Sequence, residues 1–216
     1  MIKNTNVKQS HPPAGSITNP AQVRALASPT RQDIVDALES AGPCSIAALA
    51  LLLNRPADSL YFHIRRLLKV GLVIESDRRK DGRHVFAMYD VCGRPLRLSY
   101  DPPVRRADIA RVVGAALRLG IRDFNRALSD SGRSRPTSGP ARELWGGRAK
   151  GWVTPDQLAR INALIGELLA LTRGGSPDAP NATPISLSFV LAPAPAPRAA
   201  KAGKPKRPSR QIRSTR

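Results

Sequence analysis

Residues 45–86 carry two helical patterns in close succession, followed at once by two β-prone runs. Ser45 is a good N-cap for the first pattern, in which apolar residues recur at the spacing of one helix face. After a short turn, Pro56 suits the first turn of a second helix, which Gly71 is placed to end. The β-prone runs then flank an Asp-Gly pair at 81–82, which is typical of tight hairpins. This order predicts a helix-turn-helix followed by a β-hairpin, that is, a winged helix.

The second predicted helix has two contrasting faces. Leu60, Ile64 and Leu67 recur on one side, whereas the opposite side carries cations and aromatic rings. An apolar stripe beside a charged face is most often core plus solvated surface, but the order of helix, turn, helix and basic hairpin favours DNA binding. Such a helix can enter a major groove, and cations at the hairpin tip can contact phosphates or the minor groove. The predicted DNA-binding residues are Asp58, Ser59, Tyr61, Phe62, Arg65, Arg66, Lys69, Arg78, Arg79, Lys80 and Arg83.

Four side chains of this helix leave alternatives open. Arg65 and Arg66 suit guanine recognition as well as phosphate binding, and the sequence does not divide the two roles. Tyr61 suits contact with thymine methyls or sugar edges, and equally suits packing under the wing. His63 lies beside the buried stripe, so we favour packing against the helix scaffold over base contact.

Three stretches carry a family resemblance: Ala27-Ser28-Pro29-Thr30-Arg31, Leu49-Ala50, and Ser59-Leu60-Tyr61-Phe62-His63-Ile64 leading to Leu67 and Gly71-Leu72-Val73. Through them residues 20–90 resemble the ArsR-type winged-helix regulators of bacteria, taken broadly enough to include members that sense no metal. The resemblance implies a homodimeric transcriptional regulator, by default a repressor that blocks polymerase, with one helix per subunit in successive major grooves. Metal-sensing members have a Cys-x-Cys pair in the helix before the recognition helix. Residues 46–52 hold no metal ligand, so metal sensing is not implied.

Composition divides the whole chain into four parts. We expect a disordered polar arm over residues 1–19 and a winged helix-turn-helix domain over 20–101. A helical dimerisation or effector region with a late strand is expected over 102–192, and a Pro/Ala spacer with a disordered basic tail over 193–216. The predicted fold class is therefore mainly α with a small β-hairpin wing (α+β).

The region 102–192 contains two long amphipathic patterns, at about 104–128 and 154–171, and each has an apolar stripe that needs a partner surface. Alternating residues over 185–191 predict a strand at a sheet edge. We favour a homodimer over an intrachain helical hairpin, because two-fold symmetry doubles the contacts with DNA. No residue of this region points to an effector ligand. The predicted dimerisation residues are Ile109, Val113, Leu117, Ile121, Phe124, Leu158, Ile161, Ile165 and Leu168.

The charge of the chain favours polyanionic partners. Its formal net charge is +19, and residues 198–216 hold eight cations and no acid. This tail suits nonspecific phosphate binding that weakens steeply with salt, and the alternative is a solubilising tail. The rival to a sequence-specific regulator of double-stranded DNA is therefore a nucleoid-associated architectural protein with little sequence preference.

Other classes of function find little support in the sequence. No metal-ligand spacing, phosphate-binding loop or catalytic triad is present, so we expect neither an enzyme nor a metal or organic cofactor. Cys44 and Cys92 are too few for a disulfide framework, and free thiols are favoured over a redox switch. The start has no apolar leader, and no apolar run approaches the roughly 20 residues needed to span a bilayer. We therefore expect a cytoplasmic, nucleoid-associated protein without membrane contact.

Overall fold

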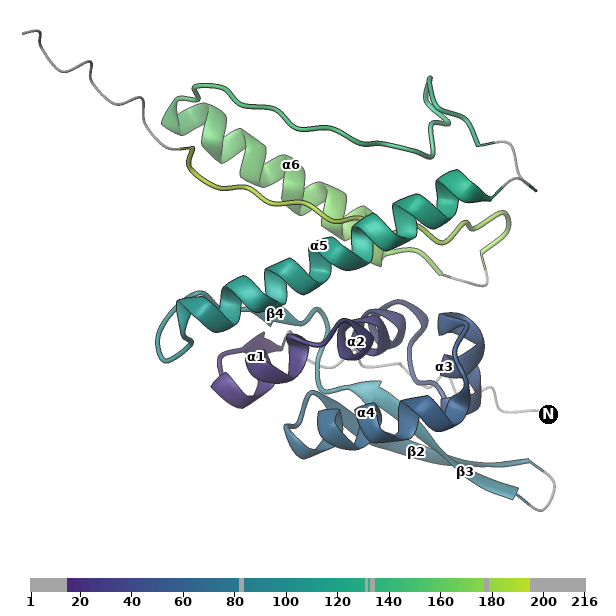
Figure 1. The fold of residues 1–216 in the computed structure, drawn as a ribbon. Coiled ribbons are helices and arrows are strands. Elements are labelled where there is room, and N and C mark those ends of the chain that lie inside the picture. The colour runs from purple at the N-terminus through teal and green to yellow at the C-terminus, as the bar shows by residue number, and fades with distance from the viewer. Residues whose placement is uncertain (1–14, 82–83, 131, 133–134, 177–178, 195–216) are drawn as a thin grey trace, which may run out of the picture.

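The structure is a computed structural model that describes residues 15–81, 84–130, 132, 135–176 and 179–194 (Figure 1). This part of the chain has six helices and two small two-stranded sheets, so the predicted α+β class is confirmed. The predictions made for Arg83, for the arm up to residue 14 and for the tail from residue 195 lie outside the described residues.

The first half of the chain is a helix-turn-helix with a wing. Its elements are α1 (Pro20–Leu26), α2 (Pro29–Ala41), α3 (Ile46–Leu53), α4 (Ala57–Lys69), β2 (Val73–Asp81) and β3 (His84–Val91). The Ser45 hydroxyl accepts a hydrogen bond from the Ala48 amide at 3.1 Å, which confirms its predicted role as the N-cap of α3. Asn54, in the left-handed region at φ 49°, ends α3, and Gly71 at φ 71° follows α4. Pro56 is the N-cap of α4, one position earlier than predicted.

The apolar stripe of α4 lies at the centre of one core. Leu60, Ile64 and Leu67 are almost completely buried. Burial of each such side chain contributes roughly 1.5–3 kcal/mol, so the stripe fixes which face of α4 points inward. The core also includes Ile34, Leu38, Leu49, Leu72, Val73 and Val91 from α2, α3 and the base of the hairpin.

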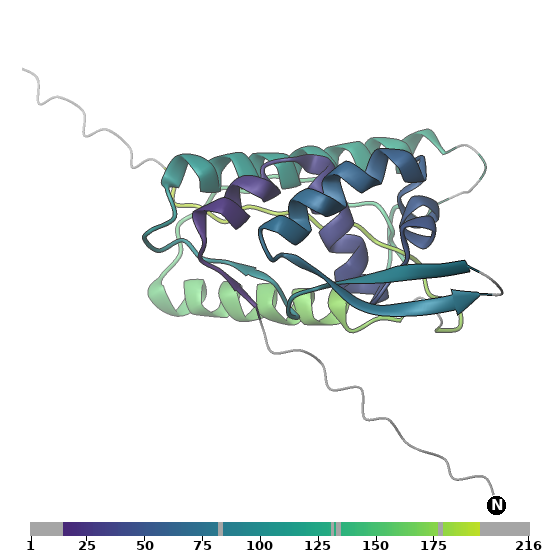
Figure 2. The ribbon, with the colours of Figure 1, turned by 90° about the horizontal axis from the view of Figure 1, so that it is seen from below.

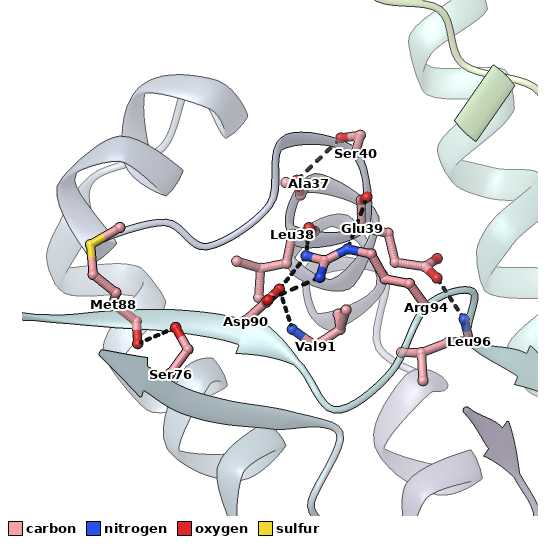
Figure 3. A network of polar contacts seen from close by, with 10 residues as sticks. All are labelled: Ala37, Leu38, Glu39, Ser40, Ser76, Met88, Asp90, Val91, Arg94 and Leu96. Atoms are coloured by element: carbon pink, nitrogen blue, oxygen red, sulfur yellow. Dashed lines mark hydrogen bonds and ion pairs between the residues drawn. The ribbon is translucent and has the colours of Figure 1, made fainter. Parts of the chain in front are cut away.

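A polar network fastens the base of the wing to the end of α2 (Figure 3). The Arg94 guanidinium forms an ion pair with Asp90 at the end of β3, and its Nη2 also donates to the Leu38 carbonyl at 2.7 Å. The Glu39 carboxylate accepts from the Leu96 amide at 2.6 Å. The Leu38 carbonyl also accepts from the Gly42 amide at 3.0 Å, so Arg94 is its second donor, and the Arg94 Nε donates to the Glu39 carbonyl in the last turn of α2 at 3.4 Å. The hairpin is thereby held at a fixed position on the helical domain.

Residues 15–19 differ from the expected disordered arm. β1 (Ser16–Ile17) pairs in parallel with β4 (Arg97–Leu98), and the Ile17 side chain is buried. The Asn19 side chain caps α1 by accepting from the Ala21 amide at 2.8 Å. Strands of two residues are too short for an alternating pattern, so their pairing depends on the tertiary fold.

The long helix α5 (Arg106–Ser129) crosses over the winged half of the chain (Figure 1). Its inward side includes Ile109, Val112 and Leu119, which are buried. The Gln32 side chain in α2 also donates to the Val112 carbonyl at 2.9 Å. The first of the two predicted amphipathic helices therefore packs against the domain that precedes it.

The helix α6 (Pro155–Arg173) and residues 179–194 lie on the side of α5 away from the winged half (Figure 1). Thr154 and Gln157 form a capping box at the start of α6. The Ser188 hydroxyl donates to the Ala116 carbonyl of α5 at 3.4 Å. Residues 185–191 have no sheet partner within the described ranges, so the predicted late strand does not form here. Among the described helices, none combines the length and apolar character required to cross a bilayer.

Candidate nucleic-acid interface

The outward face of α4 presents the polar and aromatic residues that its sequence pattern predicts. Asp58, Ser59, Arg65, Arg66 and Lys69 are all exposed. Phe62 is 62% exposed and Tyr61 is 45% exposed, although both are large apolar rings. A helix that buries its leucine stripe must turn these residues to solvent. The result is a projecting helix whose surface offers aromatic edges and cations together.

The cations of this face are not neutralised by the fold. Arg65, Arg66 and Lys69 form no ion pair with any residue in the described part of the chain. By contrast, Arg94 and Arg122 are paired with carboxylates inside the domain. Unpaired guanidinium groups on a projecting helix remain available for phosphates or guanine edges.

The wing is an antiparallel hairpin formed by β2 and β3. Its register runs from Val73 opposite Val91 to Asp81 opposite His84, with a bulge between Glu75 and Asp77. Arg79 and Lys80 are exposed and have no ion pair with a described residue. Among the described residues of the wing, Arg79 and Lys80 are therefore the cations that remain available to contact phosphate.

Arg78 differs from the other wing cations. Its Nε donates to the Glu75 carboxylate at 2.7 Å, and this hydrogen bond raises the pKa of Arg78. Because the Glu75 carboxylate offsets the charge of Arg78, the pair attracts a polyanion less strongly than an unpaired arginine would. Arg78 is among the predicted DNA-binding residues, and the structure gives it a partner within the same strand. Its exposed position allows exchange with phosphate at the cost of that pair.

The helix α4 and the hairpin share one side of the molecule. Figure 1 shows both along one edge of the fold, with α5 and α6 on the far side. Figure 2 turns this side toward the viewer, and α4 lies beside β2 and β3. Burial raises the pKa of Tyr89 in β3, and the neighbouring Glu75 and Tyr61 raise it further. Tyr61 therefore lies on the flank of α4 that faces the wing, with almost half of its surface exposed.

His63 occupies the other flank of α4. Its ring is half-buried and packs edge-on against Phe62, with the ring centroids 5.5 Å apart. Burial lowers the pKa of His63, and the positive charges of Arg31 and Arg55 lower it further. Its Nδ1 atom is buried and has no hydrogen-bond partner among the described residues. Sequence spacing does not connect Arg31 and Arg55 with this flank, because Arg31 lies in α2 and Arg55 lies in the turn before α4.

The residues predicted for dimerisation are divided between two environments. Ile109 is only 8% exposed and packs within the core of the winged half, so its side chain is covered by the chain's own fold. Val113, Leu117, Phe124, Ile161 and Ile165 are half-buried, whereas Ile121, Leu158 and Leu168 are exposed. No residue of α6 is buried. Between residues 102 and 192, the exposed large apolar residues that the prediction did not include are, within the described ranges, Leu128, Trp145, Trp152, Val153, Leu164, Leu171, Ile185, Leu187, Phe189, Val190 and Leu191.

Comparison with known proteins identifies the class of the domain. Residues 26–76 match the model of a family described as "Helix-turn-helix domain", and this segment spans α2, α3, α4 and the start of β2. This segment is thus a helix-turn-helix domain, and together with the β2–β3 hairpin it has the winged helix-turn-helix fold, a type of domain that binds DNA. The match agrees with the resemblance of residues 20–90 to ArsR-type regulators.

Two solved structures are also similar to the chain. The oxidized form of MarR from E. coli has 14% sequence identity and a TM-score of 0.25, with 69% of this chain and 85% of that chain covered. RV1404 from Mycobacterium tuberculosis has 18% identity and a TM-score of 0.24, with 74% and 86% covered. No curated protein sequence matches the chain.

Proposed function

We propose that the protein is a sequence-specific transcriptional regulator that acts as a homodimer, most simply as a repressor that occupies a promoter. The observation that carries the proposal is the exposed face of α4, where Phe62 is exposed and where Arg65 and Lys69 form no ion pair with a described residue, beside the exposed cations Arg79 and Lys80 of the wing. An α-helix with this surface fits the major groove, in which each base pair presents a distinct pattern of donors and acceptors. Its place of action is then the chromosome in the cytoplasm.

The homodimer is supported by the surface of α6. Its apolar residues recur on one side of the helix, but Leu164 and Leu168 remain 46% and 45% exposed in the single chain. An amphipathic helix that buries no residue needs a further surface, because its apolar side gains little from the intrachain fold. A second copy supplies that surface and places a second α4 on the DNA. The two recognition helices would then read half-sites related by two-fold symmetry.

Selection from random duplex DNA tests the proposal. Full-length protein is mixed with a pool of randomised duplexes, and the bound fragments are amplified and sequenced over several rounds at two salt concentrations. We expect a dyad-symmetric motif that is preferred by about 10³-fold or more over mixed sequence. A nucleoid-coating protein would instead enrich no motif and would bind all duplexes alike. Recovery without enrichment at both salt concentrations would contradict a sequence-specific regulator.

A further inference from the structure

The two flanks of α4 have different neighbours. Tyr61 and Arg65 are one turn apart on the flank beside the wing. Ser59, His63 and Arg66 follow one another at positions i, i+4 and i+7 along the opposite flank. In Figure 2 the hairpin lies on one side of α4, and α1 leading into α2 lies on the other. The second flank therefore faces the junction of α1 and α2.

Two arginines from other elements approach this second flank. Arg55 lies in the turn between α3 and α4, and its Nη2 is 3.5 Å from Oδ2 of Asp33 in α2. Arg31 lies near the start of α2, and its Nε donates to the Ala25 carbonyl at 2.5 Å. This hydrogen bond holds the Arg31 side chain at the α1–α2 junction. The packing of α2 against α4 then brings both arginines toward the flank that carries His63.

Electrostatic interactions also couple these groups. Burial lowers the pKa of Arg31, and the charge of Arg66 lowers it further. The pKa of His63 is lowered by burial and then by the charges of Arg31 and Arg55. Arg31 of α2 is therefore coupled both to His63 and to Arg66 of α4, and Arg55 of the turn is coupled to His63.

The described residues leave this group of cations largely uncompensated. Asp33 is the carboxylate nearest to Arg55, but both of its oxygens accept from Arg122 of α5, at 2.7 and 3.1 Å. The hydrogen bonds from Arg122 to Asp33 are shorter than the 3.5 Å ion pair with Arg55, so Arg55 is the more weakly held partner. Arg31 and Arg66 form no ion pair with a described residue. Like charges held together repel, and a polyanion relieves that repulsion.

We propose that Arg31, Arg55 and Arg66 form a second phosphate-binding surface, which contacts the DNA strand across the major groove from the strand that the wing contacts. The inference rests on the proposed function and names the residues that contact the second phosphate backbone of the major groove. An α-helix with its side chains is about 10–12 Å across, and the major groove is about 12 Å wide. Side chains from both flanks of an inserted helix therefore reach both phosphate backbones. Arg79 and Lys80 of the wing contact the phosphates of one strand, and the three arginines contact the phosphates of the other.

Removal of single charges from this surface tests the proposal. The variants Arg66→Ala and Arg55→Gln are compared with the full-length wild-type protein in binding to a mixed-sequence duplex over a range of salt concentrations. Arg31 is left intact because it also binds the Ala25 carbonyl. Arg126→Ala is the matched control, since Arg126 is an exposed cation of α5 without an ion pair in the described structure. Arg66→Lys retains the charge at the proposed contact.

Each neutralising variant should reduce the slope of log affinity against log salt by about 0.9, the value for one lost phosphate contact. Arg66→Lys should restore the slope, and Arg126→Ala should leave it unchanged. A second measurement uses duplexes in which a single phosphate is replaced by a neutral methylphosphonate. Some replacements on the strand opposite the wing should weaken binding of the wild-type protein, and these same replacements should not weaken binding of Arg66→Ala. Wild-type slopes in both neutralising variants would overturn the second surface while leaving the proposed function intact. Failure of the wild-type protein itself to bind duplex DNA would instead contradict the proposed function.

Discussion

Replacement of Leu164 and Leu168 by glutamate should convert the protein to a monomer and weaken binding to its selected duplex by about 10²-fold or more. Both side chains lie on the apolar side of α6 and are nearly half exposed in the single chain. A carboxylate buried in a dimer interface without a partner is strongly unfavourable, so Leu164→Glu/Leu168→Glu removes the interface. A single winged domain then contacts one half-site and loses most of the difference between specific and nonspecific binding.

Sedimentation velocity measures the oligomeric state in this experiment, and a fluorescence binding titration measures the affinity. The matched control is Ala163→Glu/Ala170→Glu, which adds the same charge to exposed positions on the opposite side of α6. Because α6 buries no residue in the single chain, the thermal unfolding of the winged half should be the same in both variants. A Leu164→Glu/Leu168→Glu protein that remains dimeric and retains its affinity would contradict the proposed dimer surface.

Substitution of Arg65 by alanine should reduce the preference for the selected duplex over mixed sequence. A bidentate contact between arginine and guanine contributes about 1–3 kcal/mol of discrimination, which corresponds to roughly 5- to 150-fold. Arg65 is exposed on α4 and has no ion pair among the described residues, so its replacement breaks no ion pair within the described part of the chain. Phe62→Ala should act in the same direction if its ring contacts thymine methyl groups.

Competition titrations with selected and mixed-sequence duplexes measure the two affinities side by side. Lys80→Ala is the control, because a wing cation that contacts phosphate should weaken both affinities by the same factor. Circular dichroism verifies that each variant keeps its helices. Equal losses on the two duplexes for Arg65→Ala would show that Arg65 contacts phosphate and reads no base.

The elements of the winged half were predictable because their signals are local. The spacing of Leu60, Ile64 and Leu67 determines which side of α4 is buried, and Ser45 begins α3 through its own side chain. The wing likewise follows from a short turn between β-prone runs. The exposed face of α4 could be predicted for the same reason, since it is the complement of the buried stripe.

Features that depend on tertiary contact could not be predicted from the sequence. Arg31, Arg55 and Arg66 belong to separate elements, and only the packing of α2 against α4 makes them neighbours. The ion pair between Arg78 and Glu75 lies beside a bulge that disturbs the alternation of side chains along β2. Residues 185–191 alternate as a strand would, but a strand forms only where another strand edge is available.

Backbone amide chemical shifts of the full-length protein, followed during titration with the selected duplex, test the central claim most directly. If α4 and the wing form the DNA-binding surface, the largest changes should occur in residues 57–69 and 75–87, with little change in α6. Changes confined to the basic tail at 198–216, with the amides of α4 unaltered, would contradict the assignment of that surface.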